Sequence, residues 1–252
     1  MYDITVIIPT FNEEGNIGNM VETIHRVCQA DGINAEILVV DDNSRDGTIA
    51  IVRSLQNRMT NLSLIIRTEN PGLSQSLYEG MKHAKADIIQ CIDCDFSHPP
   101  ERIPDFYPLI KTEGYDMVIG SRYIQEGRVL NWTLNRRVLS FGAALLGRVL
   151  IPHVHDSGSG FFAFRKTVID NVLLKPRGFR MGFEILGKGN WLRVREIPIC
   201  FKDRVEGQSK MRLAIVIDYL KQWINIISYN ISAEKSPSNI ILSWKFFLHL
   251  SA

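Results

Sequence analysis

Residues 86–95 have the sequence Ala-Asp-Ile-Ile-Gln-Cys-Ile-Asp-Cys-Asp, an apolar run that ends in two carboxylates one residue apart. The run predicts a buried β-strand, so Asp93 and Asp95 are expected at its carboxyl end. Carboxylates next to a buried strand cost free energy unless their charge is compensated. Mg²⁺ is often bound by one or two carboxylates together with substrate phosphates. The pair therefore indicates metal-assisted chemistry on a phosphorylated substrate, with a solvated surface turn as the alternative.

Similar apolar runs flank this strand throughout the first 120 residues and alternate with segments of helical spacing. We expect strands at 4–8, 37–40, 62–66, 88–92 and 117–119, and helices at 14–30, 46–56, 72–84 and 103–111. Pro9 is expected to end the first strand. Continuous apolar strands that alternate with helices predict an α/β fold, with a mainly parallel sheet covered by helices on both faces.

Each acidic motif of this half follows a predicted strand: residues 12–13, residues 41–42 and residues 93–95. Ligands of parallel sheets bind outside the carboxyl ends of the strands, so we expect these motifs to meet at one edge. Helix capping is the alternative for residues 12–13, and also for Ser44 or Asp46. Capping does not explain the adjacent pair at 41–42, which could accept hydrogen bonds from ribose hydroxyls or a base.

The chain after residue 120 has a less regular pattern. We expect a polar loop at 120–130, a helix at 136–151, a glycine-serine turn at 156–161, a strand at 194–200, a loop at 202–210 and a long helix at 211–232. This half also supplies cations, namely Arg122, Arg136, Arg204 and Lys210. Arginine suits bidentate phosphate binding, although a solvated surface is the alternative for any one of them.

Composition excludes several other classes of protein. The 252 residues carry a formal net charge of +2, so no overall field indicates a nucleic-acid partner. Neither a P-loop nor a dinucleotide-binding glycine motif is present. Cys91 and Cys94 form a C-x-x-C, but no second pair completes four zinc ligands, so we interpret them as buried small side chains. His98 could be a third metal ligand, although a lone histidine in a turn is more often structural.

In order along the chain, these motifs resemble an inverting family 2 glycosyltransferase. The residues that carry the resemblance are Pro9-Thr10-x-Asn12-Glu13, Asp41-Asp42-x-Ser44-x-Asp46-Gly47-Thr48, Gly72-Leu73, Asp93-x-Asp95, Ser97-His98-Pro99-Pro100-Glu101 and Gly120-Ser121-Arg122-Tyr123. Within the family, the chain resembles the polyprenol-phosphate branch, the dolichol-phosphate mannosyltransferases. That branch is indicated by Trp132, Arg136, Asp156-x-x-Ser159-Gly160-Phe161, Glu184, Glu196-Ile197-Pro198-Ile199-x-Phe201 and Arg204-x-x-Gly207-x-Ser209-Lys210.

The resemblance implies a GT-A-type nucleotide-diphospho-sugar transferase fold and a set of site residues. Asp93 and Asp95 would hold Mg²⁺ or Mn²⁺, and the residues implied as catalytic are Asp95, Arg122 and Arg204. The residues implied in substrate binding are Pro9, Thr10, Glu13, Asp41, Asp42, Asp93, Cys94, Arg122, Arg136, Arg204 and Lys210.

The implied reaction is a metal-dependent, inverting transfer of a hexose, chiefly mannose from GDP-mannose, to polyprenyl or dolichyl phosphate. A UDP-sugar-dependent glucosyl- or N-acetylhexosaminyl-transferase acting on undecaprenyl phosphate is the alternative within the family. A nucleotidyltransferase and a non-catalytic sugar-nucleotide-binding partner are more distant alternatives.

Two departures from the family pattern concern individual contacts. Some relatives use a glutamine as a metal ligand two residues after the acidic pair, but Ser97 stands there in this chain. An arginine is common after the serine-glycine turn, whereas Phe162 follows Phe161 here. The contact of that arginine is therefore lost or moved to Arg165.

The implied acceptor places the protein at a membrane surface. We expect a peripheral protein on the cytoplasmic face, with a catalytic domain over 1–210, an amphipathic helix over 211–232 and a short apolar tail over 233–252. Helix 211–232 suits an interfacial position, and packing on the domain's own core is the alternative. The apolar run at 240–250 is too short to span a bilayer.

Overall fold

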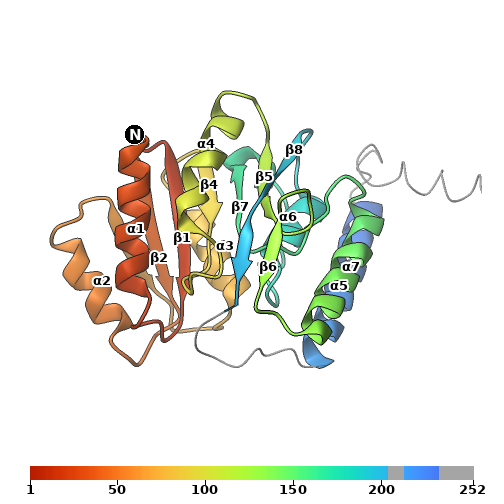
Figure 1. Cartoon of the computed structure of the whole chain (residues 1–252), viewed down its shortest axis with the longest axis horizontal. Helices are drawn as coiled ribbons and strands as arrows, with labels where there is room; N and C mark the ends of the chain where they lie inside the picture. Colours follow the sequence, from red (N-terminus) through yellow and green to blue (C-terminus); the bar gives the residue numbers. More distant parts are fainter. Residues whose placement is uncertain (204–212, 233–252) are drawn as a thin grey trace, which may run out of the picture.

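The computed structural model describes residues 1–203 and 213–232. A seven-stranded sheet with the order β3-β2-β1-β4-β7-β5-β8 forms its centre (Figure 1). Its strands are β1 (Ile4–Thr10), β2 (Ala35–Asp41), β3 (Leu62–Ile66), β4 (Ile88–Cys91), β5 (Met117–Ser121), β7 (Phe162–Arg165) and β8 (Val194–Pro198). The predicted α/β fold with a mainly parallel sheet is confirmed, because six of these seven strands run in one direction.

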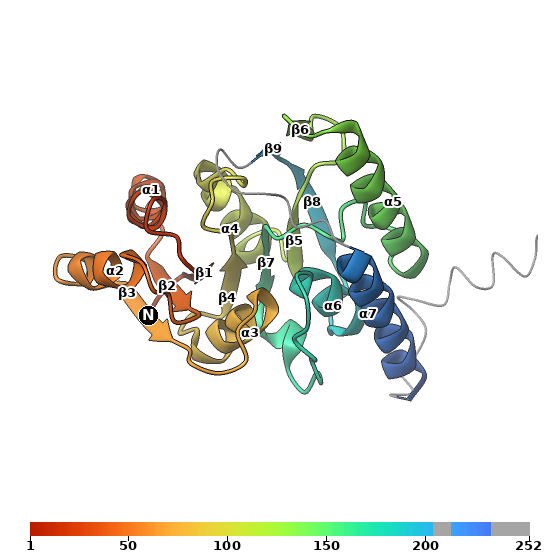
Figure 2. The same ribbon diagram turned by 90° about the horizontal axis from the view of Figure 1, so that it is seen from below.

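Helices cover both faces of the sheet, as Figure 2 shows along its edge. One apolar core lies under α1 (Ile17–Ala30), α2 (Thr48–Gln56) and α4 (Ile103–Lys111), the last preceded by a short 3₁₀ turn at Pro100–Arg102. The other lies under α3 (Leu73–His83), α6 (Met181–Lys188), α7 (Leu213–Ser232) and the end of α5 (Leu134–Leu150). Strands buried on both faces explain why their sequences are continuously apolar.

Strand β7 is the one antiparallel strand of the main sheet, and it lies between β4 and β5. Its first residue, Phe162, pairs with Cys91 at the end of β4 and with Ile119 near the end of β5. Because β7 runs the other way, the turn that precedes it lies at the edge where the parallel strands end. The reversed direction of β7 brings the glycine-serine turn beside the acidic pair. Sequence spacing does not reveal this reversal.

Pro9 does not end the first strand, contrary to the prediction, since β1 continues to Thr10. The carbonyl of Ile7 accepts a hydrogen bond from Ile92 after β4, and the carbonyl of Thr10 accepts one from Asp42 after β2. Alternation along the strand therefore turns the nitrogen of Pro9 toward the β4 side. The pairing of β1 with β4 already ends at Ile7, so the missing N–H costs no ladder hydrogen bond.

The second half also differs from the prediction in two strands. The expected loop at 120–130 contains β6 (Arg128–Leu130), which pairs in parallel with β9 (Cys200–Lys202) in a small second sheet. The expected single strand 194–200 is divided at Ile199 into β8 and β9. The division follows from pairing, because β5 ends at Ser121 opposite Pro198 and the chain then pairs with β6.

Helices α5 and α7 lie side by side at one end of the molecule (Figure 1). The Tyr219 hydroxyl of α7 donates to the Ala143 carbonyl at 2.8 Å, and Trp223 Nε1 donates to the Leu146 carbonyl at 3.3 Å. Packing on the domain therefore accounts for one face of α7. Other side chains of the two helices are exposed: Leu134, Val138, Leu139, Phe141, Leu145 and Val149 of α5, and Leu220, Ile224 and Ile231 of α7.

Within the described parts of the chain, every helix is too short or too polar to cross a membrane. The predicted tail at 233–252 and the residues 211–212 lie outside the described residues.

Candidate functional site

The loops that follow β1 and β2 hold each other through hydrogen bonds. Asp41, at the end of β2, is fully buried, and its Oδ2 accepts the hydroxyls of Thr10 at 2.7 Å and Ser44 at 2.6 Å. The backbone N–H of Ser44 donates to the other oxygen, Oδ1, at 2.7 Å. Both carboxylate oxygens therefore already accept hydrogen bonds from the protein, and the residue has no exposed surface.

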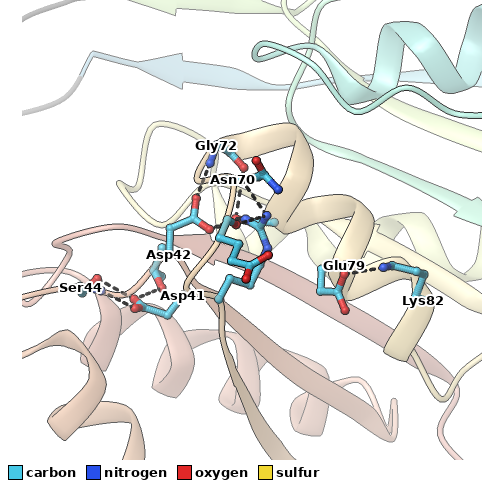
Figure 3. A network of polar contacts seen from close by, with 11 residues as sticks. Asp41, Asp42, Ser44, Asn70, Gly72, Glu79 and Lys82 are labelled. Atoms are coloured by element: carbon cyan, nitrogen blue, oxygen red, sulfur yellow. Dashed lines mark hydrogen bonds and ion pairs between the residues drawn. The ribbon is translucent and has the colours of Figure 1, made fainter.

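Asp42 has a different set of partners, shown in Figure 3. Its oxygens accept hydrogen bonds from the Arg67 guanidinium, from the Ser76 hydroxyl at 2.8 Å and from the Gly72 N–H at 2.6 Å. Gly72 and Ser76 belong to the start of α3, so Asp42 anchors that helix to the end of β2. The two acids of the pair therefore have different roles. Asp41 binds the loops after β1 and β2, and Asp42 binds Arg67 and the start of α3.

The turn at residues 12–14 completes this acidic region. The N–H of Asn12 donates to Ser44 Oγ, and the N–H of Glu13 donates to Thr48 Oγ1, both at 2.8 Å. Asp46 Oδ1 in turn accepts the hydroxyl and the N–H of Thr48 at the start of α2. Burial acts to raise the pKa of Asp46, but hydrogen bonds from Thr48 and from backbone N–H groups outweigh it and lower that pKa. Asp46 thus bonds the first residue of α2, but the N-cap position itself is Gly47, which has no side-chain cap hydrogen bond.

Asp93 and Asp95 follow β4 at the same edge of the sheet, as predicted. Asp95 Oδ1 accepts the N–H of Ser97 at 2.9 Å, and the Asp93 side chain is 24% exposed. Two carboxylates at an open strand end fit a hard cation that takes its remaining ligands from a diphosphate and water. Across residues 1–203 and 213–232, no group of three or more His, Cys, Asp or Glu side chains is arranged to hold a metal ion.

Two neighbours of the acidic pair are buried. Cys94 belongs to the apolar core, and burial raises the pKa of its thiol, so any contact with a substrate would use its backbone. The interpretation of Cys91 and Cys94 as buried small side chains is confirmed, since both are free thiols in the core. His98 Nδ1 lies 3.6 Å from Asp93 Oδ2, and its ring packs on Phe161 and Phe201. The described residues thus include no three-ligand group that contains His98.

The turn at 156–160 contacts three charged side chains with alternate residues. Asp156 forms an ion pair with Arg122, Gly158 lies against the Arg180 guanidinium, and Gly160 lies against the Asp93 carboxylate. A Cβ at 160 would come within 3.1 Å of Asp93 Oδ2, and one at 158 within 2.2 Å of Arg180 Nη1. The two glycines therefore permit a close approach that any side chain would change. The turn connects the acidic pair with the arginines.

Arg122 follows β5 and is bound by Asp156 in a bidentate, buried pair. Its Nε and Nη2 donate to the two carboxylate oxygens at 2.7 Å, and the side chains are 9% and 0% exposed. Asp156 lowers the free energy of the charged guanidinium enough to raise the pKa of Arg122 against the opposing effect of burial. The rings of Tyr123, Trp132 and Phe201 surround the guanidinium at 5.3–5.4 Å. Only its Nη1 end is without a hydrogen bond within the described residues.

Arg136, on α5, stacks over the Trp132 ring at 4.3 Å and pairs with Asp203 at 2.5 Å. Trp132 therefore contacts both Arg122 and Arg136. The two other predicted cations, Arg204 and Lys210, lie outside the described residues.

The arginine expected near the serine-glycine turn comes from a different element than predicted. Arg165 lies at the far end of β7, where it donates to the Ile110 carbonyl, so the contact is not moved to Arg165. The structure instead brings Arg180 to the turn, and sequence reasoning missed it. The sequence contained one signal for Arg180, since it directly precedes the predicted Glu184 segment. A cation at the start of a helix is disfavoured by the helix dipole, so its presence there suggests another role.

A mainly parallel sheet with paired acids after a central strand is the arrangement that the resemblance implied for a GT-A-type fold. The chain belongs to glycosyl transferase family 2, whose model matches residues 5–173.

Three similar proteins are each named dolichol-phosphate mannosyltransferase. The Pyrococcus furiosus protein is 39% identical over 90% of this chain, and the chain spans 64% of that relative's length. The Mycosarcoma maydis protein is 32% identical, over 89% of this chain and 79% of its own length. The Saccharomyces cerevisiae protein is 30% identical, over 97% of this chain and 93% of its own.

Solved structures with the same fold include glucosyl-3-phosphoglycerate synthase from Mycobacterium tuberculosis. Its complex with Mn²⁺, UDP and phosphoglyceric acid superposes with a TM-score of 0.68 at 18% identity, covering 89% of this chain and 78% of that one. The complex of the same enzyme with Mg²⁺ and UDP has a TM-score of 0.67 at 17% identity, covering 89% and 79%. At this identity the likeness establishes the GT-A-type fold.

Proposed function

We propose that this chain transfers mannose from GDP-mannose to a polyprenyl phosphate, such as dolichyl phosphate, with inversion at the anomeric carbon. The observation that carries the proposal is the 156–160 turn, which contacts both Asp93 and Arg122. A carboxylate suited to a metal-bound diphosphate and an arginine suited to a phosphate therefore lie at the same edge of the sheet. The relatives named dolichol-phosphate mannosyltransferase support the class of donor and acceptor.

The donor's nucleoside is assigned to the acidic loops after β1 and β2. We retain Pro9, Thr10, Glu13, Asp41 and Asp42 as residues of this subsite. Glu13 is half-buried and so accessible to a ligand. Asp41 holds Thr10 and Ser44 in place.

The acceptor requires little proton transfer. A phosphate monoester is largely dianionic at neutral pH, because its second pKa is about 6. Its oxygen can therefore attack the anomeric carbon without a general base. The protein's task is then electrostatic, since the acceptor phosphate and the leaving diphosphate repel each other and need cations around them.

Arg122 and Arg136 supply part of this cationic surrounding, and Arg204 and Lys210 are proposed to complete it. Asp93 and Asp95 would hold Mg²⁺ or Mn²⁺, which when bound stabilises negative charge on the leaving diphosphate. The two carboxylates support this assignment because a diphosphate and water can provide the remaining ligands.

A membrane surface is the proposed location, with the protein peripheral on its cytoplasmic face. Exposed apolar residues of α5 recur at helical spacing, at 134, 138, 141, 145 and 149.

Flotation with anionic vesicles tests this surface. The double variant Phe141→Ser, Leu145→Ser is expected to float less than the wild type. Leu192→Ser, which changes an 85% exposed residue elsewhere, serves as the control and is expected to float normally.

The direct test of the proposed function is radiolabel transfer in detergent. Purified protein is given a panel of labelled sugar nucleotides and a polyprenyl phosphate, with Mg²⁺, Mn²⁺ or a chelator. Metal-dependent transfer of mannose from GDP-mannose is the expected result. Transfer from a UDP-sugar to undecaprenyl phosphate alone would replace the donor and acceptor. Folded protein that binds nucleotide but forms no lipid product with any donor would overturn the proposal.

A further inference from the structure

Arg180 is a half-buried cation that the catalytic scheme above does not use. Its Nη1 lies against Gly158, and its guanidinium carbon lies 4.5 Å from the centroid of the Tyr219 ring on α7. Within residues 1–203 and 213–232, Arg180 forms no ion pair with a carboxylate. Among the described residues, the charge of Arg180 is therefore compensated by an aromatic ring and by no carboxylate, which is costly for a cation partly withdrawn from water.

The surroundings of Arg180 add positive potential. Asp156, across the turn, is already engaged by Arg122, and Asp218 of α7 lines the same small pocket as Arg180 without forming an ion pair with it. Burial lowers the pKa of Arg180; Arg122 lowers it too, while Tyr219 and Asp156 act in the opposite direction. The N-terminus of α6 begins at the next residue and contributes its positive dipole end. Arginine stays charged in proteins, so this corner has a net attraction for anions.

Contacts with the 156–160 turn and with α7 fix the position of Arg180. Along the 156–160 turn, the contact with Arg180 is two residues from the contact with Asp93, which corresponds to at most about 7 Å of chain. On its other side, Arg180 packs on Tyr219, which binds α5 through the Ala143 carbonyl. The guanidinium thus lies between the acidic pair and the two helices with exposed apolar side chains.

We propose that Arg180 binds the phosphate group of the acceptor, a phosphate monoester carried on an isoprenoid chain. The identity of the acceptor rests on the proposed function. The binding of a phosphate by Arg180 rests on the contacts described here. A phosphate bound by Arg180 would lie close to the 156–160 turn, whose Gly160 lies against Asp93.

Four variants test this inference. Arg180→Gln removes the charge, and Arg180→Lys keeps the charge without the bidentate fork. Gly158→Ala keeps Arg180 but places a methyl group where its Nη1 now lies, so the guanidinium must shift. Lys175→Gln is the matched control, since it removes an exposed cation of the same segment that does not line the pocket of Arg180.

Binding is measured by calorimetry on the full chain with citronellyl phosphate, a soluble isoprenyl phosphate, with inorganic phosphate and with GDP plus Mn²⁺. We expect Arg180→Gln to weaken citronellyl phosphate binding about tenfold or more. Arg180→Lys and Gly158→Ala are expected to fall between it and the wild type. Nucleotide binding is expected to stay unchanged in the two Arg180 variants, and Lys175→Gln to bind all three ligands normally.

Unchanged citronellyl phosphate binding in Arg180→Gln would overturn the inference. An equal loss of GDP binding would also overturn it, because Arg180 would then serve the donor or the fold. If only the binding of inorganic phosphate became weaker, Arg180 would bind a free anion and not the lipid phosphate, and the inference would be wrong. Binding does not require turnover, so these results stay informative if the radiolabel experiment finds no lipid product. In an active enzyme, Arg180→Gln should raise KM for the acceptor and leave KM for the donor unchanged.

Discussion

The acidic loops after β1 and β2 differ from the region around the 156–160 turn, where Arg122 and Arg180 lie, in how their charges are compensated. In the acidic loops, Asp41 and Asp42 are each satisfied by three or more hydrogen bonds from the protein itself. At the turn, Arg122 is paired with Asp156, but Arg180 has no carboxylate partner within the described residues. Within the described residues, the carboxylates of the first region therefore have protein partners, whereas Arg180 in the second forms no ion pair.

This difference bears on how each region would bind the ligand proposed for it. A region whose polar groups bind one another presents a rigid, preformed surface and gains little charge compensation from a ligand. A region with surplus charge gains free energy when an anion arrives, so it suits a phosphate that must lie near a second negative group. The four predictions below test that contrast, from the largest expected effect to the smallest.

Asp95→Ala is expected to lower the transfer rate by about a thousandfold or more, because one of two carboxylates proposed to hold the metal is lost. Circular dichroism is expected to report an unchanged fold, and the radiolabel assay measures the rate. Asp105→Ala, at an exposed ion pair with Arg102, is the control and should retain full activity. Near-wild-type turnover of folded Asp95→Ala would remove Asp95 from the metal role.

Asp156→Ala is expected to lower the free energy of unfolding by roughly 3–5 kcal/mol, because it leaves Arg122 buried without its partner. Urea titration followed by circular dichroism measures the change. Asp105→Ala again provides the comparison, since breaking its exposed pair should cost no more than about 1 kcal/mol. Equal losses of unfolding free energy in the two variants would mean that the buried Arg122–Asp156 pair contributes no more to stability than the exposed pair.

Thr10→Val should cost roughly 1.5–3 kcal/mol of stability, because it removes a hydrogen bond to the buried Asp41 carboxylate. It should also raise KM for the sugar nucleotide. Thr5→Val is the matched variant, since Thr5 donates to the buried Glu36 at the other end of the same strand. It should destabilise to a similar extent and leave KM unchanged. If both variants change KM alike, the acidic loops have no special relation to the donor.

Gly160→Ala should raise the half-saturating concentration of Mg²⁺ or Mn²⁺ a few-fold. The added methyl group would lie 3.1 Å from Asp93 Oδ2, so the carboxylate must move by a few tenths of an ångström. Gly142→Ala, where nothing lies within 4 Å of the new methyl group, controls for the loss of a glycine. Metal titration of the transfer rate measures both variants, and identical curves would show that the turn does not position Asp93.

The first half of the fold and its acidic motifs could be predicted from the sequence because their signals are local. Each strand is a continuous apolar run, and each acidic motif directly follows such a run in residues 1–120. The error at Pro9 arose because the effect of a missing N–H depends on which neighbour the nitrogen faces. That information belongs to the sheet and not to the strand.

By itself, the sequence determined the class of fold, the family and the acids at the strand ends, since apolar periodicity and motif order are properties of the chain alone. The tertiary structure decided the rest. The antiparallel insertion of β7 carries the 156–160 turn to the site, and the packing of α6 against that turn brings Arg180 beside Gly158. Residues 158 and 180 are too far apart for any local pattern to relate them. Their meeting depends on long-range packing, which sets the charge balance of the site.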